Sequence, residues 1–499
     1  MTQGIEAAAP PELAVLQAVG IPDLLRRVAG ASALYGLANF GIRALNFLLL
    51  PLYTRYLAPT DYGSITLAES FAAFCVLVIG LGFDSALQRL YFSYVDDSTA
   101  LGSYLGSTIK FALASGSFAV LLTVTIGMPV LRMFAPHFDI PYRFLVWAIL
   151  TAVSAQFLQY RLTVFQSQGK PRSYAALALV SFALTASFSV AMVVFAHRGA
   201  SGMLLGKLAA SLVGLIVALF LFSGALHSTF QWHYVRETLA IGAPLVPHQL
   251  MAGGLMVADR FILGYYRDLR EVGLYSIAYT FGGVMSLVTL SLTQAWAPAY
   301  FDLARSEEAG RRAIARISSA LTIVLSAIAC FGALISQEFI AHFLDHRYLA
   351  AGPIVPWIIG AYLAHAVFSL LSLAVLQARK TRWLMLVSSI AFVANTMLNV
   401  ALIPHWGIYG AACATIVAYI VEVLVIYVVA QHLYKLNYDL WRMLGAFGVF
   451  SLVLVATQLN LSGGRRLVTL AFIAALSLSL LAALGLRHAI VLLRVSRSM

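Results

Sequence analysis

The sequence predicts an all-α polytopic membrane protein with about fourteen transmembrane helices, arranged as two six-helix lobes and a C-terminal helix pair. Three observations predict this fold class. Of the 499 residues, 61% are hydrophobic and only 10% are charged, and the mean hydropathy is +0.88. The chain therefore lacks the polar surface of a large water-soluble protein. Apolar runs long enough to cross a bilayer recur along it, and its two halves share landmarks at nearly one offset.

Crossing the hydrocarbon core of a bilayer takes about 20 apolar residues, and charges, Gly and Pro separate such runs here. We expect helices near residues 30–53, 62–88, 104–128, 143–166, 173–196, 200–222, 237–264, 271–297, 313–336, 353–377, 382–403, 407–431, 441–458 and 466–485. Every connection between them is short, so no catalytic domain outside the membrane is expected. Cys75, Cys330 and Cys413 lie inside apolar runs and are interpreted as small core residues.

The net charge of +12 comes from Lys and Arg residues spread thinly between apolar runs. They form no continuous basic face, so nucleic acid is not expected as a partner. Most of them fall on alternate connections, such as 170–172, 305–316 and 379–382, which predicts that both termini are cytoplasmic. Arg465 and Arg466 fall on the opposite side. The first residues lack the pattern of a cleaved signal peptide and are interpreted as a cytoplasmic tail.

An internal duplication divides the chain. Four landmarks recur about 210 residues apart. They are Gly63 and Gly273, Gln166 and Gln377, His197 and His405, and the triplets 90–92 and 299–301. The repeat contains an even number of helices, so both copies enter the membrane in the same orientation, related by an axis along the membrane normal. We expect a cytoplasmic tail at 1–27, an N-lobe at 28–226, a C-lobe at 227–434, and helices 13 and 14 with a tail at 435–499.

Polar residues inside the apolar runs are candidates for function, because a charge at the centre of a membrane helix costs about 2.5–3.5 kcal/mol on insertion scales. As substrate-binding candidates we name Arg43, Asn46, Lys110, Gln156, Gln159, Arg161, Arg260 and Gln294. As coupling or gating candidates we name Asp84, His248, Asp259 and Glu422.

Alternatives stay open for several of these cations. Arg43 lies deepest by count and is expected to line an internal cavity. Lys110 and Arg161 either serve the same cavity or extend to a nearby membrane surface. Asp259 and Arg260 either bind substrate or form an ion pair that closes the outer side.

The uncharged candidates have structural alternatives as well. Gln156, Gln159 and Gln294 either contact substrate or link helices through hydrogen bonds. His248 is either a proton carrier or a packing residue. The span 237–264 contains Gly242, Pro244 and Pro247, and is the best candidate for a bent or broken helix.

Cations predominate over carboxylates among the deep positions of the first half, which favours an anionic passenger such as a phosphate or pyrophosphate. A site for organic cations would instead need a deep carboxylate, for which Asp84 and Glu422 are the candidates. The sequence contains no Walker motif, so ATP hydrolysis by this chain is not expected.

Several motifs resemble those of Wzx-type polysaccharide biosynthesis proteins. They are RYLAPTDYG at 55–63, GLGF at 80–83, ALQR at 86–89, DRFILG at 259–264, VGLY at 272–275 and LIPHWGIYGAA at 402–412. They are spread over most of residues 30–432 and are fairly specific together.

The resemblance implies membership of the multidrug/oligosaccharidyl-lipid/polysaccharide exporter superfamily, with two six-helix lobes around a central cavity. It implies a flippase, not an enzyme, that moves undecaprenyl-pyrophosphate-linked oligosaccharides across the bacterial inner membrane for O-antigen, exopolysaccharide or capsule. By this resemblance Arg43 would hold the pyrophosphate. No cofactor is expected, and a proton or sodium gradient is a candidate driving force. Expected partners are the lipid-linked glycan, membrane lipids, a polysaccharide polymerase and glycosyltransferases.

Three rival functions remain open at this point. A lipid II flippase or a multidrug or cation antiporter would use the same scaffold, and in the antiporter Asp84 or Glu422 should be essential and Arg43 dispensable. A membrane glycan polymerase or ligase would need a catalytic acid or nucleophile beside a sizeable outer loop, and we find neither in the sequence.

Overall fold

A computed structural model describes residues 21–127, 140–305, 308–459 and 473–483, with side chains from residue 34 onward except that of His248. Every element in these ranges is a helix, which confirms the all-α membrane fold. Nine of the described helices are long and apolar enough to cross a membrane, or ten if the bent pair Trp232–Leu245 and Gln249–Tyr266 is one span. Fourteen crossings are therefore not confirmed as a number.

Within each described range the helices follow one another with short connections. In chain order they are α2 (Ile21–Leu48), α3 (Leu50–Tyr56), α4 (Pro59–Ile79), α5 (Phe83–Tyr94), α6 (Ser98–Leu122), η1 (Thr123–Gly127), α8 (Tyr142–Ser167), α9 (Pro171–Val190), η2 (Ala191–Phe195), α10 (Gly199–Leu221), α11 (Ser223–Leu226), α12 (Trp232–Gly242), η3 (Ala243–Leu245), α13 (Val246–Tyr266), α14 (Leu269–Leu303), α15 (Glu308–Phe343), η4 (His346–Ile354), α16 (Val355–Gln377), α17 (Arg382–Leu433) and α18 (Leu440–Thr457).

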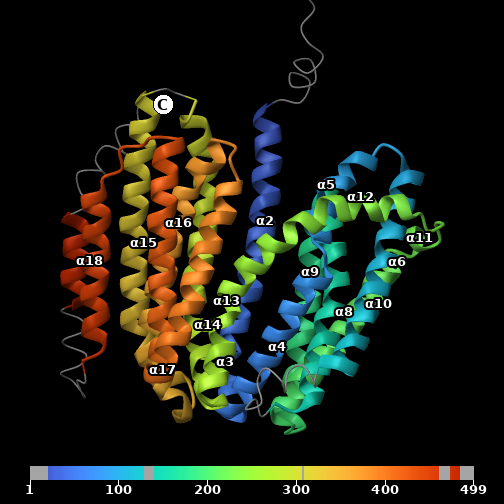
Figure 1. Cartoon of the computed structure of the whole chain (residues 1–499), viewed down its shortest axis with the longest axis horizontal. Coiled ribbons are helices and arrows are strands. Elements are labelled where there is room, and N and C mark those ends of the chain that lie inside the picture. Colours follow the sequence, from blue (N-terminus) through green and yellow to red (C-terminus); the bar gives the residue numbers. More distant parts are fainter. Residues whose placement is uncertain (1–20, 128–139, 306–307, 460–472, 484–499) are drawn as a thin grey trace, which may run out of the picture.

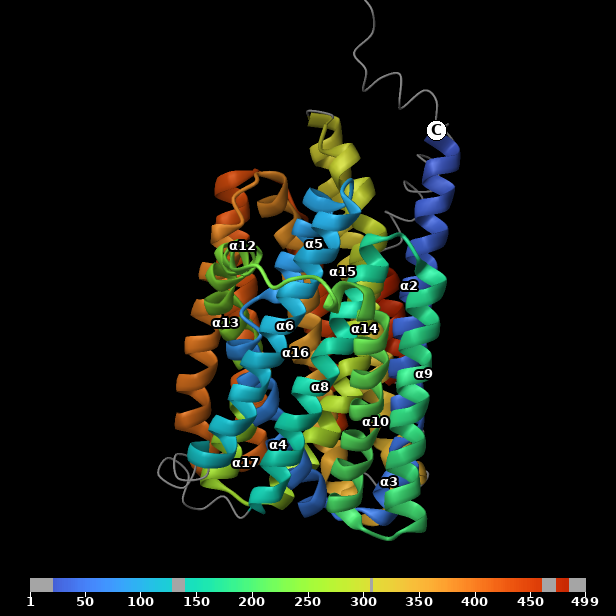
Figure 2. The ribbon, with the colours of Figure 1, turned by 90° about the vertical axis from the view of Figure 1, so that its right-hand side faces the viewer.

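Two bundles lie side by side in Figure 1, and Figure 2 views the molecule from the side of α6, α8, α9 and α10, with α15 and α16 behind them. The N-lobe contains α4 to α10, and the C-lobe contains α13 to α17, with α18 packed on the outside of α15. Helix α2 stands between the lobes and contacts α9 on one side and α14 on the other. We call the end of the molecule that carries α3 and η4 the lower end, as it is drawn in Figure 1, and the opposite end the upper end.

The predicted duplication is visible in the backbone. Gly63 of α4 and Gly273 of α14 press against each other's helix, so that a Cβ atom at Gly63 would lie 1.9 Å from the carbonyl oxygen of Leu269. A Cβ atom at Gly273 would lie 1.8 Å from the equivalent oxygen of Pro59. This reciprocal contact is what a two-fold relation between the lobes produces.

Positive φ angles recur at matching places too. Gly199 has φ +55° and Gly407 has φ +54°, and Gly169 with φ +61° corresponds to Arg379 with φ +56°. Both copies of the repeat therefore turn through a residue of positive φ at each of these two positions. At the second pair, the first copy has glycine and the second copy has arginine.

We expect Arg379→Gly to stabilise the protein by about 0.5–1 kcal/mol, because glycine adopts positive φ without the steric cost that arginine carries. The reciprocal change, Gly169→Arg, should destabilise it by a similar amount. Thermal unfolding of the purified variants measures both effects. A lower melting temperature for Arg379→Gly would contradict this interpretation of the turn.

Several predicted boundaries need correction. The span predicted at 62–88 is broken, since α4 ends at Ile79 and α5 begins at Phe83 after a turn in which Leu81 and Gly82 both have positive φ. Residues 21–27, expected in the tail, belong to α2. The span predicted at 466–485 is described only over Ile473–Ala483, which is helical.

The predicted bend of the span 237–264 is confirmed. The segment Trp232–Leu245, which includes η3, meets the segment Gln249–Tyr266 at 52°. Helix α12 packs on α5 and α6, whereas α13 packs on α17. The predicted start of the C-lobe at residue 227 therefore falls too early, because α12 lies on the N-lobe and the chain changes lobe only at the bend.

Candidate functional site

Two cavities that contain charged and polar side chains among their lining residues lie between the lobes, and α2 contributes to both. The lower cavity has a volume of about 570 Å³ and is lined from α2 and α3, from α4 and α10 of the N-lobe, and from α13, α14 and α16 of the C-lobe. Its charged and amide residues are Asn46, Glu69, Lys207 and Arg260, and its wall includes Tyr53, Tyr62, Tyr279 and Tyr362. Both lobes therefore place ionic groups against the same space.

The N-lobe side of the lower cavity carries an ion pair between Glu69 of α4 and Lys207 of α10. Neither residue was among the candidates from the sequence. Both lie within apolar runs, so the same rule on the cost of intramembrane charges that singled out Arg43 identifies them as well.

The C-lobe side carries Asp259 and Arg260 of α13. The Asp259 carboxylate is completely buried and accepts hydrogen bonds from the Tyr275 hydroxyl at 2.8 Å and from the Arg260 backbone N–H at 2.8 Å. The Arg260 guanidinium lies 3.7 Å from this carboxylate and 4.4 Å from the centre of the Tyr279 ring. Its buried Nε has no hydrogen-bond partner among the described residues. Arg260 thus lines the lower cavity while its guanidinium is held by Asp259 and by the Met256 carbonyl oxygen, to which it donates.

The upper cavity is larger, about 750 Å³, and lies between α2 and α14 with one contribution from α8. Its polar lining residues are Tyr35, Asn39, Arg43, Gln166, Ser291 and Gln294. Arg43 has no carboxylate within ion-pair distance in the ranges that the structure describes. Arg43 therefore supplies a net positive charge to a cavity that also offers several amide and hydroxyl groups.

Four sequence candidates, Lys110, Gln156, Asp84 and Arg161, are engaged elsewhere within the N-lobe. The Lys110 ammonium donates to the carbonyl oxygen of Ser228 at 2.6 Å. Gln156 donates to the Asp84 carboxylate at 2.6 Å. The Arg161 guanidinium lies over the rings of Phe165 and Phe222. None of the four lines either cavity, so the candidate site does not include them.

Gln159 and Glu422 also lie away from the cavities. Gln159 is exposed on α8 and lines neither cavity. Glu422 of α17 is buried in the C-lobe, where its carboxylate lies 3.0 Å from Nδ1 of His365. His248 falls in α13, and its side chain lies outside the described part of the chain. Of the predicted residues, Arg43 and Gln294 share the upper cavity, and Asn46 and Arg260 share the lower one.

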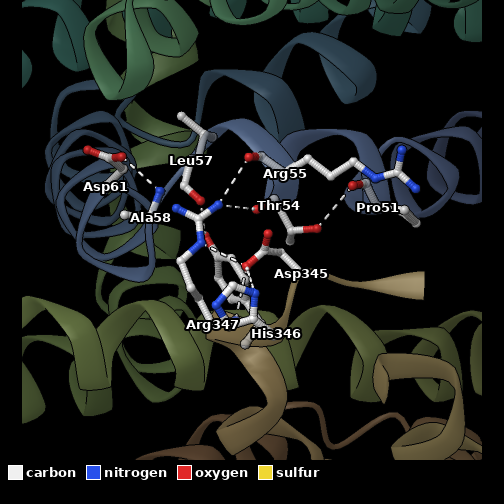
Figure 3. Close-up of polar contacts among 10 residues, drawn as sticks. Pro51, Thr54, Arg55, Leu57, Ala58, Asp61, Asp345, His346 and Arg347 are labelled. Atoms are coloured by element: carbon white, nitrogen blue, oxygen red, sulfur yellow. Dashed lines mark hydrogen bonds and ion pairs between the residues drawn. The ribbon is translucent and has the colours of Figure 1, made fainter. Parts of the chain in front are cut away.

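The lobes are held together at the lower end. Beyond the crossing of α4 and α14, Figure 3 shows Arg347 of η4 reaching the end of α3. Its guanidinium donates to the carbonyl oxygens of Thr54 at 3.1 Å and Arg55 at 3.0 Å, while its Nε donates to Asp345 at 2.7 Å. The Tyr348 hydroxyl donates to Leu57. We call these contacts the lower latch.

We expect Arg347→Gln to destabilise the protein by about 1.5 kcal/mol, because it removes charge-assisted hydrogen bonds to two carbonyl oxygens. Arg55→Gln is a matched control, since the latch uses only the backbone of Arg55. Thermal unfolding compares the two variants, and equal stability would contradict the assignment of the latch to Arg347.

The latch should hold throughout the neutral range. Hydrogen bonds from Arg347 lower the pKa of the Asp345 carboxyl below its usual value. A lowered folded-state pKa adds stability above the unfolded-state pKa of about 3.9, and this stability is lost only as the pH falls through the folded-state value. Between about pH 5 and about pH 8 we therefore expect the contribution of Asp345 to the free energy of unfolding to stay constant.

Comparison with known proteins identifies the family. A profile of the family described as polysaccharide biosynthesis protein matches residues 52–353, more than half of the chain. The chain belongs to the polysaccharide biosynthesis protein family. Two *Haemophilus influenzae* proteins are similar to this family member. Lsg locus putative protein 1 is 24% identical over 289 residues, covering 56% of this chain and 67% of that protein. An uncharacterized membrane protein is 18% identical over 326 residues, which cover 64% of this chain and 76% of that protein.

Solved structures share the fold of this polysaccharide biosynthesis protein. Lipid II flippase MurJ, in an inward closed conformation, has a TM-score of 0.73 at 15% identity and covers 92% of this chain and 100% of its own. A variant of the *Vibrio cholerae* MATE transporter VcmN has a TM-score of 0.56 at 12% identity, covering 82% and 97%. The protein is thus a multi-pass membrane protein with the fold of these transporters and flippases.

Proposed function

We propose that this protein is a flippase that moves undecaprenyl-pyrophosphate-linked oligosaccharides across the bacterial inner membrane by alternating access, for surface polysaccharide biosynthesis. The observation that carries the proposal is the pair of polar cavities between two duplicated lobes, with Arg43 and Arg260 presented to them. Guanidinium groups suit phosphate oxygens, and amides, hydroxyls and tyrosines suit the hydroxyl groups of sugars.

The apolar part of such a substrate also has a place near the cavities. A groove of about 230 Å³ lies between α14, α15 and α16 beside Phe47 of α2, and its lining is almost entirely apolar. A polyprenyl tail lying there or in the adjacent lipid would stay in apolar surroundings while the head group occupies the cavities.

The antiporter alternative is less well supported. Its two carboxylate candidates, Asp84 and Glu422, are already engaged by Gln156 and His365 and line neither cavity. We propose that rocking of the lobes exposes the cavities alternately, driven by an ion gradient or by removal of the flipped product. Glycosyltransferases would supply the substrate and a polymerase would consume it.

The test combines deletion and reconstitution. In a deletion strain we expect lipid-linked oligosaccharide to accumulate with its glycan on the inner leaflet, and the wild-type gene should restore surface polysaccharide. Purified protein in proteoliposomes should move a fluorescent polyprenyl-pyrophosphate glycan, which excludes compensation by a second flippase. Arg43→Ala should lose this transport, and Asp84→Asn and Glu422→Gln should retain it. Transport that survives Arg43→Ala but fails in the carboxylate variants would favour the antiporter.

A further inference from the structure

A third cavity lies at the upper end of the C-lobe, away from the space between the lobes. We call it the basic pocket. Its volume is about 480 Å³, and it is lined by Glu308, Arg311, Arg312 and Arg316 of α15 and by Lys435 and Asn437 of the link between α17 and α18. Residues distant in sequence meet here because α18 packs on α15.

The basic pocket carries excess positive charge. Glu308 pairs with Arg312 at 2.6 Å, which neutralises one of the four cations. Arg311, Arg316 and Lys435 have no carboxylate partner within ion-pair distance among the residues that the structure describes. The Arg311 guanidinium is positioned by the Tyr434 ring, 4.9 Å from its centre. Three cations around one space repel each other unless an anion lies between them.

The position of the pocket along α15 indicates the level of the lipid head groups. The helix has 36 residues, about 54 Å at 1.5 Å per residue, and is longer than the hydrocarbon core of about 30 Å. Its three arginines lie in the first three turns, before the apolar stretch that begins at Ile317. The pocket therefore lies where α15 leaves the apolar layer.

Helix α18, next to the pocket, presents a lipid-facing stripe. Trp441 in its first turn is 81% exposed, and Leu444, Leu452 and Val455 on the same helical face are also exposed. A tryptophan at the end of an apolar helix is typical of the membrane interface. An apolar surface long enough for acyl chains thus runs away from the basic pocket.

We propose that the basic pocket binds the phosphate head group of an anionic phospholipid, with the acyl chains along the exposed stripe of α18. Arg311, Arg316 and Lys435 would bind the oxygens of any phosphate group, whether it belongs to a lipid or to a soluble phosphate. The exposed apolar stripe on α18 favours the lipid. Basic pockets between membrane helices bind anionic lipids in this way. This site is separate from the substrate cavities and does not depend on the proposed transport.

The experiment compares two triple variants that remove equal charge from the same end of the molecule. Arg311→Gln, Arg316→Gln and Lys435→Gln together remove the three cations of the basic pocket that have no ion-pair partner among the described residues. Arg172→Gln, Lys380→Gln and Arg382→Gln are the control, since all three are exposed and none lines the pocket. Native mass spectrometry of the purified full chain measures binding of short-chain phosphatidylglycerol and phosphatidylcholine, with and without millimolar inorganic phosphate.

We expect the wild type to bind phosphatidylglycerol at least about tenfold more tightly than phosphatidylcholine, and the pocket variant to lose this preference. The control variant should keep it, and inorganic phosphate should not displace the lipid. Equal binding of the two lipids, or equal loss in both variants, would overturn the proposal. Displacement by inorganic phosphate would overturn the lipid assignment in favour of a soluble phosphate. If the triple variant does not fold, Arg316→Gln and Lys435→Gln tested singly should each weaken phosphatidylglycerol binding by about threefold or more.

Discussion

Replacing Asp259 with alanine is expected to destabilise the protein by about 3–5 kcal/mol, because it leaves the Arg260 guanidinium buried without its carboxylate partner. Arg260→Ala should also abolish transport, because it removes the C-lobe cation from the lower cavity. Thermal unfolding and proteoliposome transport measure the two effects separately.

The double variant Asp259→Leu and Arg260→Met separates stability from function. Replacing both charges of a buried pair with apolar groups of similar size is often neutral or stabilising, so the melting temperature should recover. Transport should not recover, because the cation is still missing. A double variant that transports at the wild-type rate would show that Arg260 is not part of the substrate site.

Gly63→Leu is expected to prevent the lobes from closing at the lower end and to reduce transport by at least about tenfold. Even a Cβ atom at this position would lie 1.9 Å from the Leu269 carbonyl oxygen, and that oxygen belongs to a helix backbone that cannot rotate aside. The α4–α14 crossing must therefore separate to admit a side chain.

Labelling of a cysteine in the lower cavity measures this opening. Thr280 lines the cavity and is exposed to it, so Thr280→Cys in a protein with its three native cysteines replaced provides the reporter. Gly63→Leu should increase labelling by a membrane-impermeant thiol reagent added on the side of the lower end. Gly283→Leu in α14 is the control, because no atom lies within 4 Å of a Cβ there. Equal labelling of Gly63→Leu and wild type would argue against a closed lower end.

The duplication was predictable because it places glycine at positions where the backbone conformation or a close helix contact requires it. The helices cross at Gly63 and Gly273 too closely for a Cβ atom, so both copies of the repeat need glycine at this position. The break after Ile79 is not predicted from hydropathy, because the residues around it stay apolar while only the direction of the backbone changes. Gly80 and Gly82 are the sequence features that indicate it.

The candidate site was predictable only in part. The cost of intramembrane charge makes both Arg43 and Arg161 candidates, but Arg43 lines a cavity and Arg161 lies over two aromatic rings. Glu69 and Lys207 meet the same criterion but are not among the predicted residues. Their ion pair joins α4 and α10, which are distant in the sequence, so no local sequence pattern predicts it.

Composition and repeat spacing alone determined that this chain is a duplicated helical membrane protein, because hydropathy and period are properties of the chain itself. The tertiary structure decided which polar side chains face the space between the lobes and which are engaged within one lobe. The physical reason is that a helix turns by about 100° per residue, so the direction of a side chain depends on how its helix is rotated against its neighbours.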